Sequence, residues 1–236
     1  MDSDVTKDTV VLGVAAHPDD LDAGAAGTFA QWAKRGAKCY YLILTDGGRG
    51  SMDPKVQQDK LVAMRQEEQR AAGKIIGLTD VFFLNYADTE LTVDRALKRD
   101  IVYYIRKLKA DVVVTTDPSV IYFKSRGFIN HTDHRAAGLA TIDAVYPLAK
   151  NAYSFTEFEK EGIKPHKVKA IYLMGFGEGD EAVDITDTME LKMKAIAAHK
   201  SQALGQNGEF LKQMSELLGQ KSGYKYAESF VRLQMR

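Results

Sequence analysis

Apolar residues occur along the chain in two alternating patterns, short uninterrupted runs and longer stretches with helical periodicity. Short, strongly apolar runs predict strands over residues 10–15, 39–44, 81–84, 112–115 and 170–176. Between and after them, apolar positions recur at helical spacing over residues 21–34, 59–76, 93–108, 134–148 and 188–203. Strands that alternate with helices in this way indicate right-handed βαβ units. We therefore predict an α/β fold, a Rossmann-like three-layer αβα sandwich with a largely parallel sheet.

The length of the chain fits one large α/β domain as easily as two small ones. The chain has 236 residues, of which 45% are hydrophobic, enough to fill a sizeable core without a disulfide or a structural metal. No internal repeat, low-complexity tract or linker rich in Pro, Gly or Ser interrupts the sequence. We expect a single domain over residues 1–236, with the polar and acidic residues 1–8 as a flexible N-terminal tail.

Charge and cysteine content exclude several classes of partner and site. Lys+Arg and Asp+Glu both number 32, so a net charge of zero offers no field for nucleic acid or an anionic membrane. Residues 1–8 lack the basic start and apolar run of a signal peptide, and no stretch approaches the ~20 apolar residues of a membrane span. The single Cys39 excludes an intrachain disulfide and a multi-cysteine zinc site. We expect a cytoplasmic protein that binds neither nucleic acid nor membranes.

The first candidate site follows the first predicted strand. His17, Asp19 and Asp20 stand directly after the apolar run at 10–15, where charged groups need partners or a metal. Pro18 fixes its own φ and favours an extended His17, which predicts a sharp turn from strand to helix. His17 and Asp20 can then aim at one point, while Asp19 is directed differently and can stand beside a metal without ligating it. In a simpler interpretation, Asp19 or Asp20 only caps the helix.

A second motif, His131-Thr132-Asp133-His134, lies within loop reach of the polar end of the strand predicted at 112–115. Ligands of open parallel sheets bind beyond the carboxyl ends of the strands, so we expect both motifs at one edge. Two histidines and one carboxylate form a known catalytic zinc arrangement, in which Fe²⁺ can replace Zn²⁺. Asp133 can accept a hydrogen bond from an imidazole N–H. Alternatively, His134 is an ordinary residue at the start of a helix.

These motifs resemble those of the PIG-L/LmbE-like zinc N-deacetylases. The matching segments follow the family's order over nearly the whole chain, at residues 16–20, Gly24, Gly27, 45–47, 65–68, 71–72, 131–137, 199–202 and 226–230. Thr132 stands where the family often has proline, and Leu21 where many members have glutamate. Neither departure removes a catalytic group.

The resemblance assigns roles to particular residues. The site residues it implies are the metal ligands His17, Asp20 and His134, the general base Asp19, the oxyanion-stabilising His131, Asp133 as the residue that orients and charge-balances His131, and Arg65 near the substrate. Two of the matched residues also have ordinary interpretations. Arg65 can instead form a surface ion pair with Glu67 or Glu68, and His199 can either hydrogen-bond within the fold or line the pocket.

The resemblance also implies an activity. The expected enzyme is a zinc-dependent N-deacetylase that removes an acetyl group from an N-acetylglucosamine-type moiety of a small conjugate or oligosaccharide. The partners implied are a small acetamido-sugar substrate and further copies of the chain in a homo-oligomer. The alternatives are an amidase of the same family that acts on a thiol-conjugate amide, and a non-catalytic zinc-binding module.

Overall fold

Strands from both halves of the chain form one sheet. The computed structural model describes residues 4–124, 127–175, 179–202 and 204–235, with the backbone alone at residues 204–207. Within these residues the main sheet has seven strands in the order β3-β2-β1-β4-β7-β9-β8. The first five pair in parallel, whereas β9 pairs antiparallel with β7 and β8. Their bounds are β1 (Val10–Ala15), β2 (Lys38–Thr45), β3 (Asp80–Tyr86), β4 (Val112–Thr116), β7 (Ala170–Met174), β8 (Glu181–Asp184) and β9 (Ala227–Gln234).

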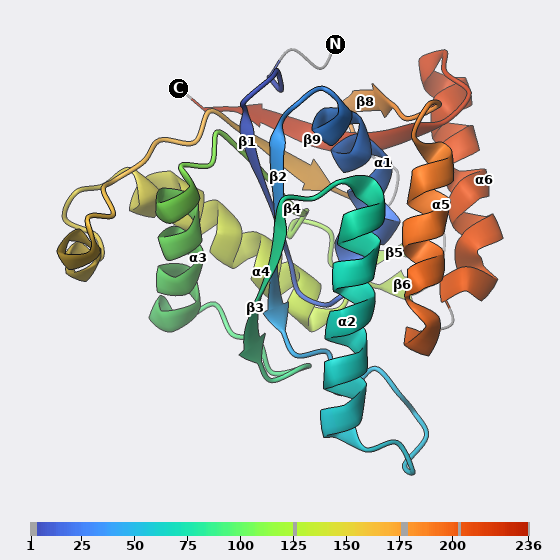
Figure 1. Ribbon diagram of the computed structural model, residues 1–236, viewed down its shortest axis with the longest axis horizontal. Helices are drawn as coiled ribbons and strands as arrows, with labels where there is room; N and C mark the ends of the chain where they lie inside the picture. Colours follow the sequence, from blue (N-terminus) through green and yellow to red (C-terminus); the bar gives the residue numbers. More distant parts are fainter. Residues whose placement is uncertain (1–3, 125–126, 176–178, 203, 236) are drawn as a thin grey trace.

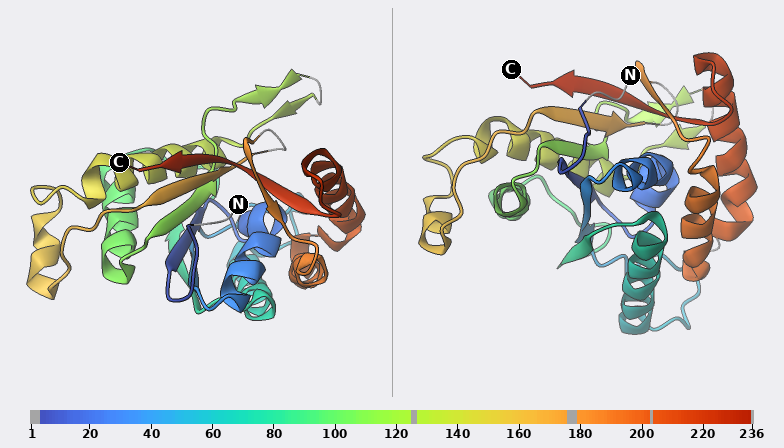
Figure 2. Two further views of the ribbon diagram at one scale, coloured as in Figure 1. Left: turned by 90° about the horizontal axis from the view of Figure 1, so that it is seen from above. Right: turned by 45° about the horizontal axis from the view of Figure 1, so that its top comes forward.

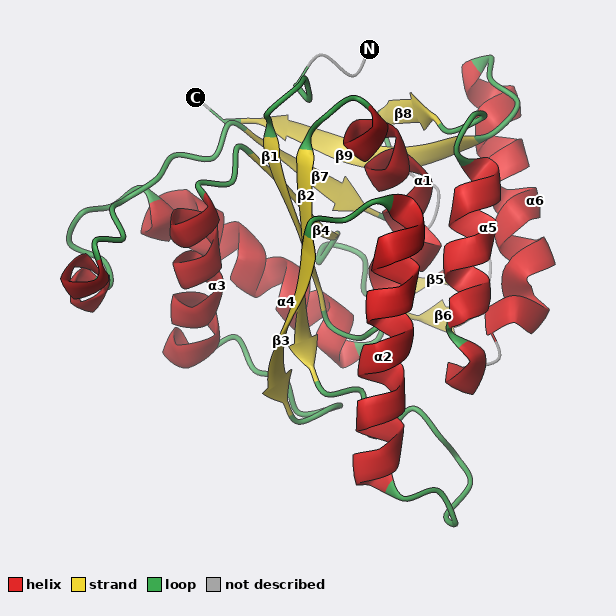
Figure 3. Ribbon diagram, viewed as in Figure 1, coloured by secondary structure: helices red, strands yellow, loops and turns green. Residues whose placement is uncertain are grey.

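Helices cover both faces of this sheet, as Figure 1 shows. One face carries α1 (Asp20–Lys34), α2 (Gln58–Ile76) and α5 (Met189–Ala198), and α6 (Leu204–Ser222) packs against α5 and β9. The other face carries α3 (Arg95–Leu108) and α4 (Thr132–Asp143). Each face has its own apolar core, one around Phe29, Trp32 and Tyr41 and the other around Leu97 and Ile101. The three-layer αβα sandwich with a largely parallel sheet is therefore confirmed (Figure 3).

The predicted elements agree with the structure best where the apolar periodicity is strongest. The strands expected at 10–15, 39–44, 81–84 and 112–115 are β1 to β4, and the strand expected at 170–176 is β7, with residue 176 outside the described residues. The helix expected over 134–148 begins earlier, at Thr132, and α4 ends at Asp143; the segment Ala144–Ala149 that follows is interrupted by an extended backbone at Tyr146, directly before Pro147. The helix expected over 188–203 ends at Ala198 and is followed by the 3₁₀ turn Lys200–Gln202; residue 203 lies outside the described residues.

Several elements have no counterpart among the sequence predictions: α6, β8, β9 and the hairpin of β5 (Tyr122–Phe123) and β6 (Phe128–Ile129). The hairpin projects from the body of the molecule beside the sheet (Figure 2). Strand β9 completes the sheet only by pairing with two other strands, an interaction that its own sequence does not encode. Among the described residues, no helix has both the length and the apolar character needed to cross a membrane.

The N-terminal segment packs on the sheet from Asp4 onward. The Asp4 carboxylate accepts hydrogen bonds from the guanidinium of Arg232 on β9 and from the hydroxyl of Tyr172 on β7. Val5 is buried in the core. Asp4 and Val5 are therefore in contact with the sheet, whereas residues 6–8 are exposed, and the flexibility of residues 1–8 stays a prediction. Residues 1–3 lie outside the described residues.

The sheet changes direction of winding between β1 and β4. The chain passes from β1 to β2 on one side and from β4 to β7 on the other. The carboxyl ends of β1 and β4 therefore border a topological switch point. Helix α4 reaches this edge because Gly138 lets it approach β4 closely: a Cβ there would lie 2.2 Å from the carbonyl oxygen of Thr116. Both sequence motifs are thereby brought to the edge where ligands bind in such folds.

Candidate active site

The first motif forms a tight turn between β1 and α1. Strand β1 ends at Ala15 and α1 begins at Asp20. Asp19, the residue before the helix, has a left-handed backbone (φ 95°), which is uncommon for a residue other than glycine. The backbone N–H of His17 donates to Oδ2 of Asp20 at 2.9 Å and closes the turn. A local strain of this kind persists only where surrounding contacts hold it.

The predicted metal ligands converge on one carboxylate. Nε2 of His134 lies 3.1 Å from Oδ1 of Asp20, and Nδ1 of His17 lies 3.6 Å from Oδ2 of the same group. The ring centroids of His17 and His134 are 5.2 Å apart. The ring centroid of His131 lies 4.8 Å from that of His17 and 5.3 Å from that of His134. The structure thus brings together the residues of the two motifs, which the sequence separates by more than a hundred positions.

Two further carboxylates hold the opposite nitrogen of His17. Its Nε2 lies 3.0 Å from Oδ1 of Asp88 and 3.3 Å from Oδ2 of Asp133. Asp88 was missed by the sequence analysis. The signal was present, because Asp88 stands two residues after the end of β3, at the edge of the sheet where His17 follows β1. Carboxylates that accept from the outer nitrogen of a ligating histidine orient its ring and raise its basicity.

The carboxylate of Asp133 contacts His17 rather than His131. The Asp133 side chain is fully buried, and its oxygens accept from the backbone N–H groups of Thr89 (2.7 Å) and Leu91 (3.2 Å) and face His17. Helix α4 begins at Thr132, so its first turn directs Asp133 inward toward the loop that follows β3. Asp133 therefore contacts His17 and ties that loop to α4, and its predicted role in balancing the charge of His131 stays a prediction.

His131 is held by the backbone instead. Its Nδ1 accepts the N–H of Asp133 at 3.2 Å, so the side chain acts as the N-cap of α4. Burial, followed by the positive charges of His17 and His134, lowers the pKa of His131. The acceptor role of Nδ1 and the lowered pKa both favour the neutral tautomer that carries its proton on Nε2. Nε2–H of His131 is then a hydrogen-bond donor.

The buried carboxylates of the cluster favour a positive charge among them. Burial opposes the protonation of His17, but the carboxylates of Asp133, Asp20 and Asp88 outweigh it and raise the pKa of His17 to about 12. Burial likewise disfavours the charged form of Asp20, but the two histidines hold the pKa of this carboxyl well below its usual range. Buried carboxylates need a compensating charge. Among the described residues, the ligand atoms of two groups lie close enough together to hold a metal: His17, His131 and His134, and His17, Asp88 and Asp133. Asp20, which contacts both His17 and His134, adds a carboxylate to the first group.

Arg65 is buried against the left-handed turn. Its side chain is 3% exposed and its two terminal nitrogens donate to the carbonyl oxygens of Gly47 and Pro18, both at 2.8 Å, and to Oδ2 of Asp19 at 3.1 Å. Gly47 has a positive φ and would place a Cβ within 2.9 Å of the guanidinium, so a larger residue is excluded there. Contact of Arg65 with substrate stays a prediction. The contacts that it makes in the structure hold Asp19.

The carboxyl of Asp19 is strongly perturbed. Burial and the adjacent negative charge of Asp20 raise its pKa to about 6, while the positive charges of Arg65, His199 and His17 act against the rise. A carboxyl with a pKa near neutrality is suited to accept and return a proton. Asp19 forms hydrogen bonds with the side chains of Gln69 and Arg65, and these bonds involve neither His17 nor His134.

A buried polar chain supports the backbone of Asp19. Its N–H donates to Oε1 of Gln69 at 2.8 Å, and Nε2 of Gln69 donates to Oδ2 of Asp22 at 2.7 Å. His199 completes the chain, with Nε2 2.8 Å from the same oxygen of Asp22. His199 has no exposed surface, so of its two interpretations the structure supports a hydrogen bond within the fold.

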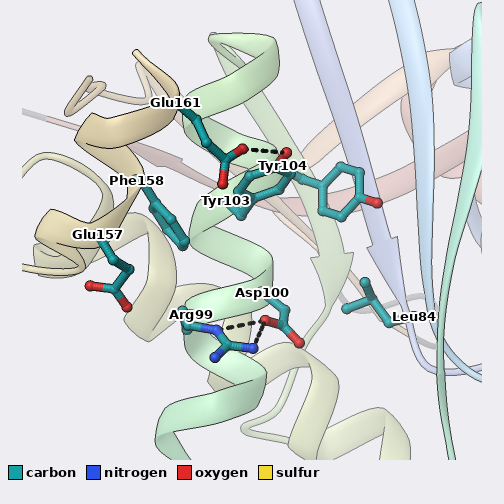
Figure 4. A pocket seen from close by; sticks show the side chains of 8 residues that line it. All are labelled: Leu84, Arg99, Asp100, Tyr103, Tyr104, Glu157, Phe158 and Glu161. Atoms are coloured by element: carbon teal, nitrogen blue, oxygen red, sulfur yellow. Dashed lines mark hydrogen bonds and ion pairs between the residues drawn. The ribbon is translucent and has the colours of Figure 1, made fainter. Parts of the chain in front are cut away.

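A separate cleft lies between α3 and the 3₁₀ turn Thr156–Glu161, away from the histidine cluster (Figure 4). Its volume is about 350 Å³. Four of the polar groups that line it form two pairs: Arg99 with Asp100 at 2.6 Å, and the hydroxyl of Tyr103 with Glu161 at 3.2 Å. These pairings leave the histidine cluster as the better candidate for chemistry.

Comparison with known proteins identifies the family. The family model of PIG-L, GlcNAc-PI de-N-acetylase, matches residues 12–145, which include both motifs of the cluster. The chain belongs to the PIG-L family. The resemblance seen in the sequence is therefore confirmed.

Individual relatives of this PIG-L protein are similar over most of its length. The diacetylchitobiose deacetylase of Thermococcus kodakarensis is 33% identical over 230 residues, which cover 96% of this chain and 82% of that one. The probable N-acetyl-α-D-glucosaminyl L-malate deacetylase 2 of Bacillus anthracis is 27% identical over 203 residues, covering 81% and 80%. Among solved structures, N,N'-diacetylchitobiose deacetylase from Pyrococcus horikoshii superimposes with a TM-score of 0.87 at 31% identity, covering 96% and 84%. These relatives are deacetylases.

Proposed function

We propose that this PIG-L protein is a metal-dependent hydrolase that removes the acetyl group from an N-acetylglucosamine-type substrate. The observation that carries the proposal is the position of Asp20 between His17 and His134, with Asp19 beside it in a turn that Arg65 and Gln69 hold. Membership of the family and the similarity to deacetylases of acetamido sugars support the same reaction.

His17, Asp20 and His134 are the proposed ligands. A Zn²⁺ or Fe²⁺ ion bound by them would supply Lewis-acid activation of a water molecule and of the amide carbonyl. Asp88 and Asp133 accept from the outer nitrogen of His17, which leaves its Nδ1 directed toward Asp20. The two outer carboxylates thus fix which nitrogen of His17 serves as the ligand atom.

Asp19 is the proposed general base. It takes a proton from the attacking water as the water oxygen bonds to the acyl carbon, and it returns that proton to the leaving nitrogen as the C–N bond breaks. The products are acetate and a free amine. Arg65 and Gln69 position Asp19 for this exchange, since both bind it directly.

His131 is the proposed donor to the oxyanion. Negative charge gathers on the former carbonyl oxygen as the tetrahedral intermediate forms. With Nδ1 engaged by the backbone of Asp133, the neutral imidazole offers Nε2–H to that oxygen. This differs from the expectation of a charged His131, because the groups around it favour its neutral form.

The test measures acetate and free amine released from N-acetylglucosamine and N,N'-diacetylchitobiose, with metal-loaded protein and with protein treated with a chelator. We expect release that stops with chelation and returns when Zn²⁺ or Fe²⁺ is restored. Metal binding without any release would favour a non-catalytic zinc-binding module. Release from an amide between cysteine and glucosamine, with none from the acetyl compounds, would favour the thiol-conjugate amidase.

A further inference from the structure

An apolar cavity opens directly from the proposed reactive centre. It measures about 300 Å³ and lies between α1, α6, β7 and β9. Asp19, Asp20 and His134 form its end at the cluster. The apolar residues of its wall are Ala23, Met174, Phe210, Leu211, Met214, Leu218 and Ala227.

The charged groups in the far wall of this cavity are matched with one another. Lys192 and Glu228 are both almost fully buried, and their charged atoms are 2.6 Å apart. Glu228 also accepts from the backbone N–H groups of Gly27 (3.1 Å) and Thr28 (2.8 Å). Because this ion pair is already satisfied, the wall offers an uncharged ligand an apolar surface rather than a free charge.

The exposed polar groups suited to a sugar lie on the other side of the cluster, where the side chains of Arg49 and Glu90 are 44% and 59% exposed. Asp88 contacts the outer nitrogen of His17, and the backbone N–H of Arg49 donates to Asp88 at 2.9 Å. The guanidinium of Arg49 is partly exposed and forms an ion pair with Glu90, which stands two residues after Asp88. Among the three histidines, only His134 borders the apolar cavity; His17 and His131 do not.

We propose that this cavity binds the acyl chain of the substrate, and that the enzyme hydrolyses N-acyl glucosamines whose acyl group is longer than acetyl. The inference rests on the proposed function, because it places the scissile amide at the cluster. An amide carries one substituent on nitrogen and another on carbon, and these point in opposite directions. With the sugar on the polar side near Arg49 and Glu90, the acyl chain enters the apolar cavity.

The size of the cavity sets the expected preference. The methyl group of an acetyl substrate covers only the part of the wall next to Asp20 and His134. Each further methylene buried against Met174, Met214 and Leu218 contributes a factor of about four in binding, if it is fully removed from water. We expect kcat/KM to rise from N-acetyl- to N-butanoyl-glucosamine by roughly 3- to 15-fold, the upper value being that of two fully buried methylenes.

The experiment compares N-acetyl-, N-butanoyl- and N-hexanoyl-glucosamine with the metal-loaded enzyme, measuring free amine. Two variants on α6 form a matched pair. Leu218→Trp fills the cavity, whereas Leu217→Trp places the same side chain at a neighbouring residue that is 51% exposed and does not line it. We expect the ratio of kcat/KM for butanoyl over acetyl to fall by roughly the same 3- to 15-fold in Leu218→Trp, as the two methylenes lose their site, and to keep its wild-type value in Leu217→Trp.

Three outcomes would overturn the inference. Hydrolysis of N-acetylglucosamine with a sharp loss for N-butanoyl- and N-hexanoyl-glucosamine would reject it while leaving the proposed function intact. The inference would also be rejected if an octyl aglycone on N-acetylglucosamine raised kcat/KM and Leu218→Trp abolished that rise. The cavity would then hold the aglycone of the sugar rather than the acyl chain. Failure to hydrolyse any of the N-acyl sugars would reject both proposals together.

Discussion

The guanidinium of Arg65 contacts the carboxylate of Asp19 at 3.1 Å, and the same nitrogen donates to the carbonyl oxygen of Pro18. One buried cation therefore holds both the side chain of the proposed base and the peptide that precedes it. This relationship accounts for a left-handed aspartate at the mouth of β1, since the contacts of Arg65 offset the cost of its conformation. The contact that positions Asp19 also places a positive charge beside its carboxylate.

Substitution of Arg65 should move the acidic limb of the pH–rate profile. The positive charge of Arg65 lowers the pKa of Asp19, so its removal in Arg65→Met raises that pKa further above the usual value. Asp19 must be ionised to accept a proton, and the acidic limb of kcat/KM should therefore shift to higher pH. Arg65→Lys keeps the charge and should leave the limb near its wild-type position while kcat falls. An unmoved limb in Arg65→Met would contradict the assignment of Asp19 as the base.

Asp19→Asn should separate catalysis from metal binding. The amide cannot take a proton from water, so we expect kcat to fall by roughly 10²–10⁴. Metal content, measured by elemental analysis, should stay that of the wild type because Asp19 is not a proposed ligand. Asp117→Asn is the control, an aspartate just beyond the end of β4 whose carboxylate accepts from Ser119. Loss of metal together with activity in Asp19→Asn would make Asp19 a ligand.

His134→Ala should weaken metal binding by more than about 100-fold, since loss even of an outer hydrogen-bond partner of a ligand costs about 10–100-fold. The fold should survive, because its apolar cores do not include the cluster. His166→Ala is the matched control: His166 contacts the carbonyl oxygen of Ala110 and lies outside the cluster. Equal metal affinity of the two variants in a chelator competition would refute the ligand set.

Asp133→Asn should act through His17 rather than through His131. Its carboxylate faces Nε2 of His17, so we expect metal affinity to fall by about 10–100-fold. The alkaline limb of the pH–rate profile should stay in place, because the pKa of His131 is already lowered and its neutral form is the proposed donor. Asp88→Asn should give the same loss of affinity, since it faces the same nitrogen. A shift of the alkaline limb to lower pH in Asp133→Asn would restore the pairing of Asp133 with a charged His131.

Gln69→Leu should destabilise the protein and not only the site. It leaves the buried N–H of Asp19 without its acceptor and removes one donor from the buried carboxylate of Asp22. We expect the free energy of unfolding to fall by about 1–3 kcal/mol, measured by urea denaturation. Gln66→Leu, three residues earlier on α2, removes only an exposed hydrogen bond to Asn85 and should stay within about 0.5 kcal/mol of the wild type. Equal effects of the two substitutions would show that the buried chain does not support the turn.

The predictions from sequence agree with the structure where they depend on residues that are close together in the chain. The strands β1, β2, β4 and β7 are short buried runs, and buried parallel strands are recognisable because both of their faces are apolar. The edge strand β3 has only Val81 buried, and its short apolar run was enough to predict it. The convergence of His17 with Asp20 follows from a spacing of three residues around one turn. The same spacing brings His131 beside His134 at the start of α4.

Other features depended on contacts between distant parts of the chain. Strand β9 contains charged and polar residues and becomes part of the sheet only between β7 and β8. The partner of Asp133 was predicted from its neighbour in sequence, yet the first turn of α4 directs it to His17, 116 residues away. Asp88 joins the cluster because parallel strands end at one edge of the sheet. The sequence by itself determined the alternation of elements and the chemistry of the two motifs, because periodicity and spacing are properties of neighbouring residues. Only the tertiary structure decided which carboxylate holds which histidine and where the apolar cavity lies, because those contacts depend on how strands and helices far apart in the chain pack together.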